Sequence, residues 1–201
     1  RMGAGHIYAM PDDGSVEPYA NITNWAARGT SAVHLKNLGN STNVDLSRVT
    51  GSDLSNLVNQ VSGAGLLNMS YVYGYDERGP SYFPAMHDIF NQVHISYPGL
   101  RTMTTAQDPT FGTSTSTSFL RPVVDIWVPQ INVYNKSNAN NLRAEGKDMW
   151  WYVCNGPWRP WPNFFVEYPA IEPRLLMGLM AHKCQTGGFY YYNIAKWPSA
   201  F

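Results

Sequence analysis

Short hydrophobic runs recur along the whole chain, and most are rich in β-branched and aromatic residues, which is typical of buried β-strands. Each run is bounded by Gly, Pro or Asn, the residues that most often form turns. The predicted strands cover residues 6–10, 32–36, 70–75, 101–105, 123–131, 149–153 and 189–193. The pattern therefore predicts seven strands spread over the full length of the chain.

Between these runs, apolar residues repeat at the spacing i, i+3, i+4 and i+7 that marks one face of a helix. The two clearest stripes are Leu54, Leu57, Val58 and Val61, and Met86, Ile89, Phe90 and Val93. Ser52 or Asp53 is the expected N-cap of the first helix, and Pro84 lies in the first turn of the second. Further helices are expected over residues 138–145 and 173–183.

Strands that alternate with helices predict an α/β fold with a parallel sheet, because parallel strands need long crossover connections. The sheet is either open and doubly wound or closed into a barrel. No Gly-x-Gly-x-x-Gly motif follows the first strands, which argues against an open dinucleotide-binding sheet. Polar residues follow several predicted strands, as at the rim that carries the active site of a barrel. We therefore expect a (β/α)8 TIM-like barrel.

The 201 residues are enough for one domain, so residues 1–201 are expected to form a single barrel domain. A complete barrel usually needs about 250 residues and eight strands. Since seven strands are predicted, the barrel is expected to lack its first strand. A missing N-terminal segment or a partner chain is expected to complete it, because an open sheet edge needs to be covered.

Composition narrows the classes of ligand. Lys and Arg together number 14, as do Asp and Glu, so no net charge attracts nucleic acid or an anionic membrane. No apolar run approaches the ~20 residues of a membrane-spanning helix. Aromatic residues make up 14% of the chain, as many as the charged residues. Such a balance fits either a large aromatic core or a site that stacks aromatic rings on a neutral carbohydrate.

Four Asn-x-Ser/Thr sequons indicate a secreted, lysosomal or other extracellular glycoprotein. The candidate glycosylation sites are Asn21, Asn40, Asn68 and Asn135. Cys154 and Cys184 either form a disulfide in such a compartment or remain two free thiols. The one pair of histidines on a predicted helix, His87 and His94, is spaced too widely for a metal clamp. Neither a metal nor a cofactor is expected.

Two adjacent acids, Asp76 and Glu77, directly follow the predicted strand at residues 70–75. Hydrolysis of a glycosidic bond needs one carboxylic acid that protonates the leaving oxygen and a second negative group that stabilises the developing positive charge. Neighbouring carboxyl groups among aromatic residues also raise one another's pKa, which suits a general acid. The alternative is a solvated turn in which Arg78 forms a salt bridge to the acids.

The region from Gly65 to Trp197 resembles the catalytic domain of glycoside hydrolase family 123 and its uncharacterised relatives. The resemblance rests on the order and spacing of six segments, whereas the first 60 residues match poorly. These segments are residues 72–77, 97–105, 124–129, 148–154, 171–174 and 187–193.

The resemblance implies a (β/α)8 barrel and a retaining β-N-acetylgalactosaminidase that uses the acetamide group of its own substrate as the nucleophile. By this resemblance Glu77 is the general acid/base, and Asp76 orients and stabilises the acetamide. No protein nucleophile and no metal are needed. The expected partner is a glycan that ends in a β-N-acetylhexosaminide.

The remaining candidate residues surround the expected pocket. A tyrosine hydroxyl that helps to hold the acetamide is assigned to Tyr134, which otherwise packs at the rim. Only one of Trp150 and Trp151 can face the pocket, because side chains alternate along a strand, and Trp151 is preferred. The other predicted substrate-binding residues are Tyr75, Gln130, Asn132, Trp158, Asn193 and Trp197. Asn132 and Asn193 serve equally well as caps of turns.

Two functions remain open on the sequence. The first is an exo-acting β-N-acetylhexosaminidase that removes terminal N-acetylgalactosamine or N-acetylglucosamine. The second is a glycoprotein on the same barrel that binds carbohydrate or assembles into a larger structure without catalysis. The adjacent acids favour the first, and the expected open edge of the barrel favours the second.

Overall fold

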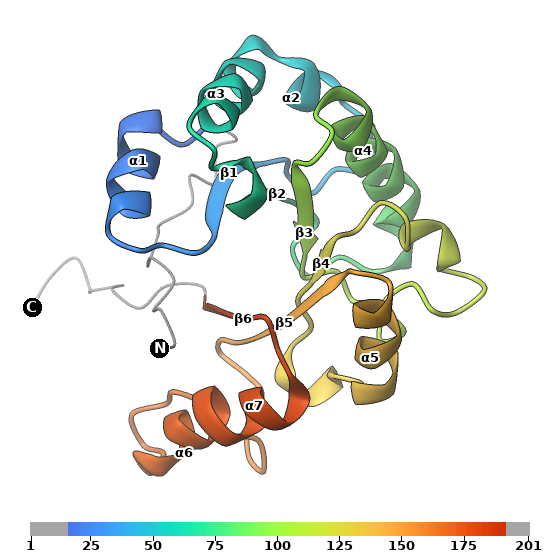
Figure 1. Ribbon diagram of the computed structural model, residues 1–201. Helices are drawn as coiled ribbons and strands as arrows, with labels where there is room; N and C mark the ends of the chain where they lie inside the picture. Colours follow the sequence, from blue (N-terminus) through green and yellow to red (C-terminus); the bar gives the residue numbers. More distant parts are fainter. Residues whose placement is uncertain (1–15, 192–201) are drawn as a thin grey trace, which may run out of the picture.

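The computed structural model describes residues 16–191, and in this range strands and helices alternate as expected. The strands are β1 (Val33–Asn37), β2 (Ser70–Tyr73), β3 (Arg101–Thr104), β4 (Ile126–Trp127), β5 (Asp148–Val153) and β6 (Gly188–Tyr191). They form one parallel sheet in the order β1-β2-β3-β4-β5-β6, which curls into a half-barrel (Figure 1). The predicted strand at residues 6–10 lies outside the described residues.

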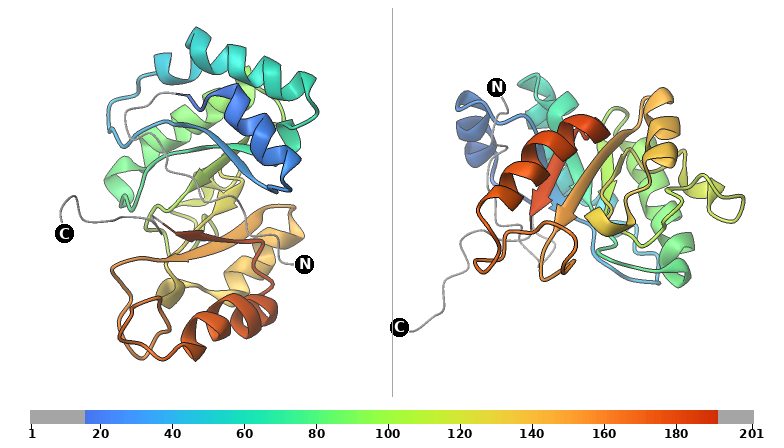
Figure 2. Two further views of the ribbon diagram at one scale, coloured as in Figure 1. Left: turned by 90° about the vertical axis from the view of Figure 1, so that its left-hand side faces the viewer. Right: turned by 90° about the horizontal axis from the view of Figure 1, so that it is seen from below.

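Helices lie along the outer side of the curled sheet (Figure 1). The α-helices are α1 (Tyr19–Ala27), α2 (Ser47–Thr50), α3 (Ser52–Gly63), α4 (Phe83–Ser96), α5 (Lys136–Ala144), α6 (Ile171–Arg174) and α7 (Ala181–Cys184). Short 3-10 turns are η1 (Leu67–Met69), η2 (Pro80–Tyr82), η3 (Ser118–Leu120) and η4 (Ile131–Val133), and a π-helical segment, η5 (Leu175–Met180), joins α6 to α7. Figure 2 shows α1 and α3 at one end of the arc and the α6–α7 segment at the other.

The two helices with the clearest apolar stripes are confirmed. The buried residues of α3 are Leu54, Leu57, Val58 and Val61, and those of α4 include Met86, Ile89, Phe90 and Val93. Burying each of these large side chains contributes about 1.5–3 kcal/mol, so the stripes hold both helices against the sheet. The predicted N-cap of α3 was wrong, because Gly51 occupies that position. The Asp53 carboxylate instead accepts a hydrogen bond from Lys36 Nζ at 2.6 Å.

Strand β4 is much shorter than the predicted run at residues 123–131. The backbone N–H groups of Val123 and Val124 both donate to the Leu120 carbonyl, at 3.1 and 3.0 Å, so these residues belong to a turn. The run is apolar because it is buried, and burial alone does not distinguish a strand from a buried turn. Helix α5 starts two residues earlier than predicted, since the Asn135 side chain caps it by accepting from Asn138 N at 3.0 Å.

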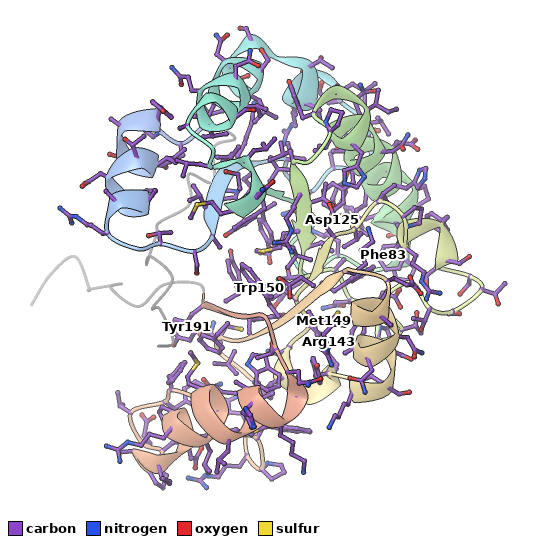
Figure 3. The ribbon with its side chains drawn as sticks, viewed as in Figure 1. Phe83, Asp125, Arg143, Met149, Trp150 and Tyr191 are labelled. Atoms are coloured by element: carbon purple, nitrogen blue, oxygen red, sulfur yellow. The ribbon has the colours of Figure 1, made fainter. Side chains whose placement is uncertain are left out.

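The two faces of the sheet carry different side chains. The outer face packs against the helices, whereas the inner face holds its own cluster of mainly aromatic residues. The buried members of this inner cluster are Tyr71, Tyr73, Met103, Ile126, Val128, Trp150 and Tyr152. Figure 3 shows Trp150 on the inner side of β5 and Met149 on the side of α5. A Cβ atom at Gly188 would lie 2.5 Å from the Trp150 ring, so the neighbouring strand needs glycine there.

Candidate active site

Asp76 and Glu77 lie in the loop that leaves β2 at the carboxyl end of the sheet. The backbone of this loop is unusual, because Tyr75 and Glu77 have φ angles of 61° and 51°. Residues other than glycine rarely adopt such left-handed conformations, and the resulting strain tends to occur at functional sites. Neighbouring loops hold the conformation: Tyr75 N donates to Gly39 O at 3.0 Å, and Gln107 N donates to Arg78 O at 2.8 Å.

The Asp76 carboxylate points back to the inner face of the sheet. Its Oδ1 atom accepts hydrogen bonds from the Tyr73 hydroxyl at 2.5 Å and from the Thr105 hydroxyl at 2.8 Å. Tyr73 and Thr105 are both buried, at the carboxyl ends of β2 and β3. Both of these hydrogen bonds reach Oδ1, and within residues 16–191 no hydrogen bond to Asp76 Oδ2 is present.

The Glu77 carboxylate is bound from a third strand. The Tyr152 hydroxyl, which belongs to β5, donates a short hydrogen bond to Glu77 Oε1. The Glu77 backbone N–H donates to Thr105 Oγ1 at 3.1 Å. Thr105 therefore touches both acids, as hydrogen-bond donor to the Asp76 side chain and as acceptor from the Glu77 backbone.

Burial keeps the two tyrosines of the site protonated. It raises the pKa of the Tyr73 hydroxyl well above its ordinary value, and the negative charges around it act in the same direction. Burial also raises the pKa of Tyr152, and its hydrogen bond to Glu77 adds to the effect. Both phenols therefore stay protonated at neutral pH and can donate hydrogen bonds to the carboxylates.

Within the described part of the chain, no cation forms an ion pair with either acid. Among the ion pairs of residues 16–191, none includes Asp76 or Glu77. Of the alternative, only the salt bridge to Arg78 is wrong, because the Arg78 guanidinium lies over the Tyr82 ring, 5.3 Å from its centre. Asp76 and Glu77 do form an exposed turn, as that alternative predicted. The side-chain groups that bind the two carboxylates are the hydroxyls of Tyr73, Thr105 and Tyr152.

Two predicted aromatic contacts of the substrate were wrong, and for Trp151 the reason is that the side-chain alternation along β5 was assigned in the wrong phase. Trp151 is buried on the helix side, where its ring packs edge-on against Tyr134, and Trp150 faces the inner side instead. Tyr75 is also buried in the core, edge-on to Phe90 of α4, because its left-handed backbone turns the side chain away from the acids.

The tyrosine assigned to the acetamide was also wrong. The Tyr134 hydroxyl donates to the Cys184 carbonyl at 3.0 Å and accepts from Arg143 Nη1 at 3.1 Å, so it joins η4 to α7 and α5 on the outer side. The tyrosines that contact the acids, Tyr73 and Tyr152, were missed. The signal that would have found them is the alternation of side chains between the two faces of a strand, because Tyr73 and Tyr152 each alternate with residues that pack against helices.

Gln130 and Asn132 follow β4 but lie differently. Gln130 continues the inward-facing positions of Ile126 and Val128, and its Nε2 atom donates to Cys154 Sγ at 3.7 Å. Asn132 lies exposed in η4. Of the two alternatives for the cysteines, the structure has two free thiols. Cys154 packs against the inner cluster. Cys184 packs on the helix side of the sheet, against the cluster of Ile131, Trp151, Val153 and Leu176, so the sheet lies between the two thiols.

Trp158, another of the predicted sugar contacts, is largely exposed, with 67% of its surface accessible. It lies in the loop after β5, where one face of its ring stacks on Phe165 at 4.6 Å between ring centres. Phe165 in turn meets Tyr168 edge-on, and the Arg159 guanidinium covers the Tyr168 ring at 4.4 Å. The predicted contacts Asn193 and Trp197 lie outside the described residues.

The four sequons differ in exposure. Asn21, Asn68 and Asn135 are exposed, whereas Asn40 is half-buried and its Oδ1 atom accepts a hydrogen bond from Asp76 N at 2.6 Å. Glycosylation at these four positions stays a prediction.

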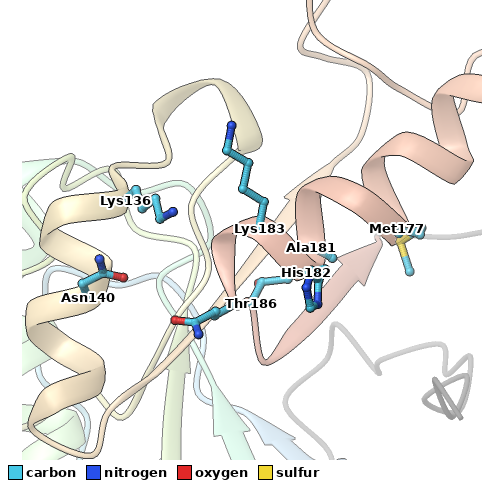
Figure 4. Close-up of a pocket in the computed structure, with 9 residues that line it drawn as sticks. Lys136, Asn140, Met177, Ala181, His182, Lys183 and Thr186 are labelled. Atoms are coloured by element: carbon cyan, nitrogen blue, oxygen red, sulfur yellow. The ribbon is translucent and has the colours of Figure 1, made fainter.

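A hollow of about 910 Å³ lies on the outer side, away from the acid pair (Figure 4). Its lining comes from α5 and from the segment η5–α7, and consists of Lys136, Asn140, Met177, Gly178, Ala181, His182, Lys183, Gln185 and Thr186. Over residues 16–191 no three His, Cys, Asp or Glu side chains are grouped to hold a metal ion. The same part of the chain has no helix long and apolar enough to cross a bilayer.

Comparison with known proteins adds one family. The sequence model described as "Glycoside hydrolase 123, catalytic domain" matches residues 21–200, which extends the resemblance towards the N-terminus. A crystal structure described as a "putative alpha-L-fucosidase" from Bacteroides thetaiotaomicron VPI-5482 is 11% identical, with a TM-score of 0.47 over 99% of this chain and 93% of that one. A structural similarity at this level carries no argument about function. No curated protein matches the chain significantly.

Proposed function

Because the chain belongs to glycoside hydrolase family 123, we propose that it removes terminal β-linked N-acetylgalactosamine from glycans by a retaining, substrate-assisted mechanism. N-acetylglucosamine is the second candidate sugar. Membership of the family makes the domain a glycosidase and its substrate a carbohydrate. The observation that supports the mechanism is that Asp76 and Glu77 both hydrogen-bond to hydroxyls from the inner face of the sheet.

In the first step Glu77, in its protonated form, donates its proton to the glycosidic oxygen, and the bond from that oxygen to C1 breaks. The carbonyl oxygen of the substrate's acetamide attacks C1 and forms a cyclic oxazolinium intermediate. Asp76 accepts a hydrogen bond from the acetamide N–H through Oδ2, and its negative charge stabilises the developing positive charge. The aglycone leaves with the proton from Glu77.

In the second step Glu77 acts as a base. It takes a proton from a water molecule, the water oxygen attacks C1, and the ring of the intermediate opens to restore the acetamide. Two displacements at C1 leave the product with the β configuration of the substrate. The carboxyl groups do not flank the bond as in ordinary retaining enzymes, because the substrate supplies the nucleophile.

The hydroxyls of Tyr73 and Thr105 bind only one oxygen of Asp76, so they fix the carboxylate while leaving its second oxygen free. The Tyr152 hydroxyl donates a hydrogen bond to Glu77, so Tyr152 lies beside the reacting groups, where Tyr134 was expected. We propose that the Tyr152 hydroxyl orients the Glu77 carboxyl group before the substrate binds. During proton transfer Glu77 then contacts both the Tyr152 hydroxyl and the leaving oxygen.

The test is hydrolysis of chromogenic N-acetyl-β-D-galactosaminide and N-acetyl-β-D-glucosaminide substrates. Glu77→Gln is expected to lower kcat by about 10²–10⁴-fold, the usual contribution of general acid–base catalysis. Asp76→Asn is expected to lower kcat by about 10²–10³-fold, as for a lost group that stabilises transition-state charge. Glu167→Gln is the matched control, because Glu167 is exposed and makes none of the ion pairs described, so it should retain full activity.

A wild-type protein that is inert on both substrates would overturn the enzymatic proposal. Binding of a β-N-acetylhexosaminide without turnover, measured by calorimetry, would then support a carbohydrate-binding protein. Proton NMR of the first product tests retention of configuration, because the proposed reaction releases the β-anomer before mutarotation.

A further inference from the structure

Asn40, which follows β1, is hydrogen-bonded to the backbone of the catalytic loop through its side chain. Its Oδ1 atom accepts from Asp76 N at 2.6 Å, across a sequence separation of 36 residues. We infer that Asn40 is a positioning residue, which fixes the Asp76 backbone and thereby the direction of its carboxylate. This inference rests on the role proposed above for Asp76.

The segment before Asn40 is tied to the catalytic loop along its length. Leu38 N donates to Tyr73 O at 2.7 Å, and Gly39 O accepts from Tyr75 N at 3.0 Å. The Asn40 side chain makes the next contact in this series, where backbone pairing ends. It therefore continues the pairing of β1 with β2 by one residue into the loop that carries the acids.

The position of Asn40 is itself constrained by Gly39. Gly39 has a φ angle of 80°, and a Cβ atom there would lie 1.9 Å from Arg48 Nη1. That nitrogen donates to the Leu38 carbonyl at 3.0 Å, and the Asn37 side chain accepts from Gly39 N at 2.8 Å. Glycine suits the positive φ angle of this turn. The hydrogen bonds of Asn37 and Arg48 hold in place the turn that presents Asn40.

Asp76 is therefore held both by its carboxylate and by its backbone. Tyr73 and Thr105 bind its carboxylate, and Asn40 binds its backbone N–H. Loss of the Asn40 contact leaves the carboxylate attached to the sheet but frees the peptide to rotate. Since small misplacements of a catalytic group lower rates strongly, we expect a kinetic effect with little loss of stability.

Asn40 is also the acceptor residue of the sequon completed by Thr42. A glycan on Asn40 would be attached to the same amide that binds the catalytic loop. The side chain of Thr42 is exposed and makes no hydrogen bond within the described residues. Thr42→Ala therefore removes the sequon and leaves the amide in place, which separates the two roles.

The test compares Asn40→Ala, Asn40→Asp and Thr42→Ala with wild type on the chromogenic galactosaminide. Asn40→Ala is expected to lower kcat about 10- to 100-fold with KM changed less than threefold, and with a similar melting temperature. Asn40→Asp keeps an acceptor oxygen, so its kcat is expected to be at least threefold higher than that of Asn40→Ala. Thr42→Ala is expected to match wild type. In an Asp76→Asn background, Asn40→Ala is expected to lower kcat by less than tenfold.

Three results would overturn the inference: an Asn40→Ala enzyme within twofold of an active wild type, an Asn40→Asp enzyme no better than Asn40→Ala, or equal losses in Thr42→Ala and Asn40→Ala. The inference would also be overturned if Asn40→Ala lowered kcat by the same factor in the Asp76→Asn background as in the wild-type background. An inert wild type is a different result, which overturns the proposed function and this inference with it.

Discussion

The two ends of the parallel sheet both carry carboxylates, but they hold them in opposite ways. At the carboxyl ends of the strands, the side chains of Asp76 and Glu77 are bound by hydroxyls and, among residues 16–191, by no cation. At the amino ends, Asp125 and Asp148 are ion-paired, as Asp125 binds Lys147 Nζ at 2.9 Å and Asp148 binds Arg101 Nη2 at 3.1 Å.

Asp125 shows what full pairing does to an acid. Its carboxylate also accepts from His94 Nε2 at 2.8 Å and from Thr102 N at 2.9 Å, and so links α4, β3 and the residue before β5. Burial by itself would raise the pKa of Asp125. The hydrogen bond from His94 and the charge of Lys147 outweigh burial and hold this pKa far below its usual range. Such a carboxylate cannot take up a proton during a reaction.

The contrast separates a structural acid from the acids that we propose to be catalytic. An acid saturated by cations is suited to stability, whereas the proposed role of Asp76 and Glu77 needs carboxyl groups that are not locked in ion pairs. The arrangement agrees with the general rule that the carboxyl end of a barrel carries catalysis and the amino end carries stability.

The largest effect expected from this comparison is on stability. Asp125→Asn removes the charge that Lys147 and His94 share, and we expect it to lower the free energy of unfolding by about 3 kcal/mol. Thermal unfolding should show a decrease in melting temperature of about 10 °C. The kcat of the folded Asp125→Asn protein should remain within twofold of wild type.

Asp76→Asn is the matched variant at the other end of the sheet, with the same change of chemistry. It is expected to lose activity and to keep its melting temperature. If Asp76→Asn unfolds more readily than Asp125→Asn, the distinction between the two ends is wrong.

A smaller effect is expected from His34, which lies on the inner face between the two ends. It packs against the Tyr71 and Tyr73 rings, at 5.5 and 6.3 Å between ring centres, and burial lowers its pKa to about 4. An unfolded chain binds this proton near pH 6.5, so His34 favours folding fully above that pH and loses its contribution as the pH falls towards 4. We expect this loss to reach about 2 kcal/mol at pH 5.

His34→Phe keeps an aromatic ring but cannot titrate. Urea unfolding between pH 4.5 and 7 should therefore show a flatter pH dependence than wild type. The exposed His182, changed to Gln, serves as the control and should keep the wild-type slope. An unchanged slope in His34→Phe would mean that charge is tolerated on the inner face.

The smallest effect is expected at Trp158. Because one face of its ring is stacked on Phe165 and the side chain is largely exposed, it suits contact with a sugar beyond the one that is cleaved. Trp158→Ala should raise KM about three- to tenfold for an extended glycan. It should leave KM for the small chromogenic substrate unchanged, and equal effects on both substrates would contradict this role.

The candidate site was predictable only in part. The acid pair stood out because two carboxyls directly after a hydrophobic strand are easily seen in a sequence. The phase of the strands was not visible, since Trp150 and Trp151 are both apolar and both buried. Trp151 was therefore assigned to the wrong face, and Tyr134 was chosen in place of Tyr152.

The sequence by itself determined the alternation of strands and helices, the helix faces that pack on the sheet and the place of Asp76 and Glu77 at a strand end. These features depend on local spacing, which the chain carries directly. Only the tertiary structure decided which hydroxyls bind the acids. Tyr73 and Thr105 are brought together by the pairing of β2 with β3, and Tyr152 of β5 reaches Glu77 because the sheet curls. The contact of Asn40 with Asp76 has the same origin, since it depends on the pairing of β1 with β2.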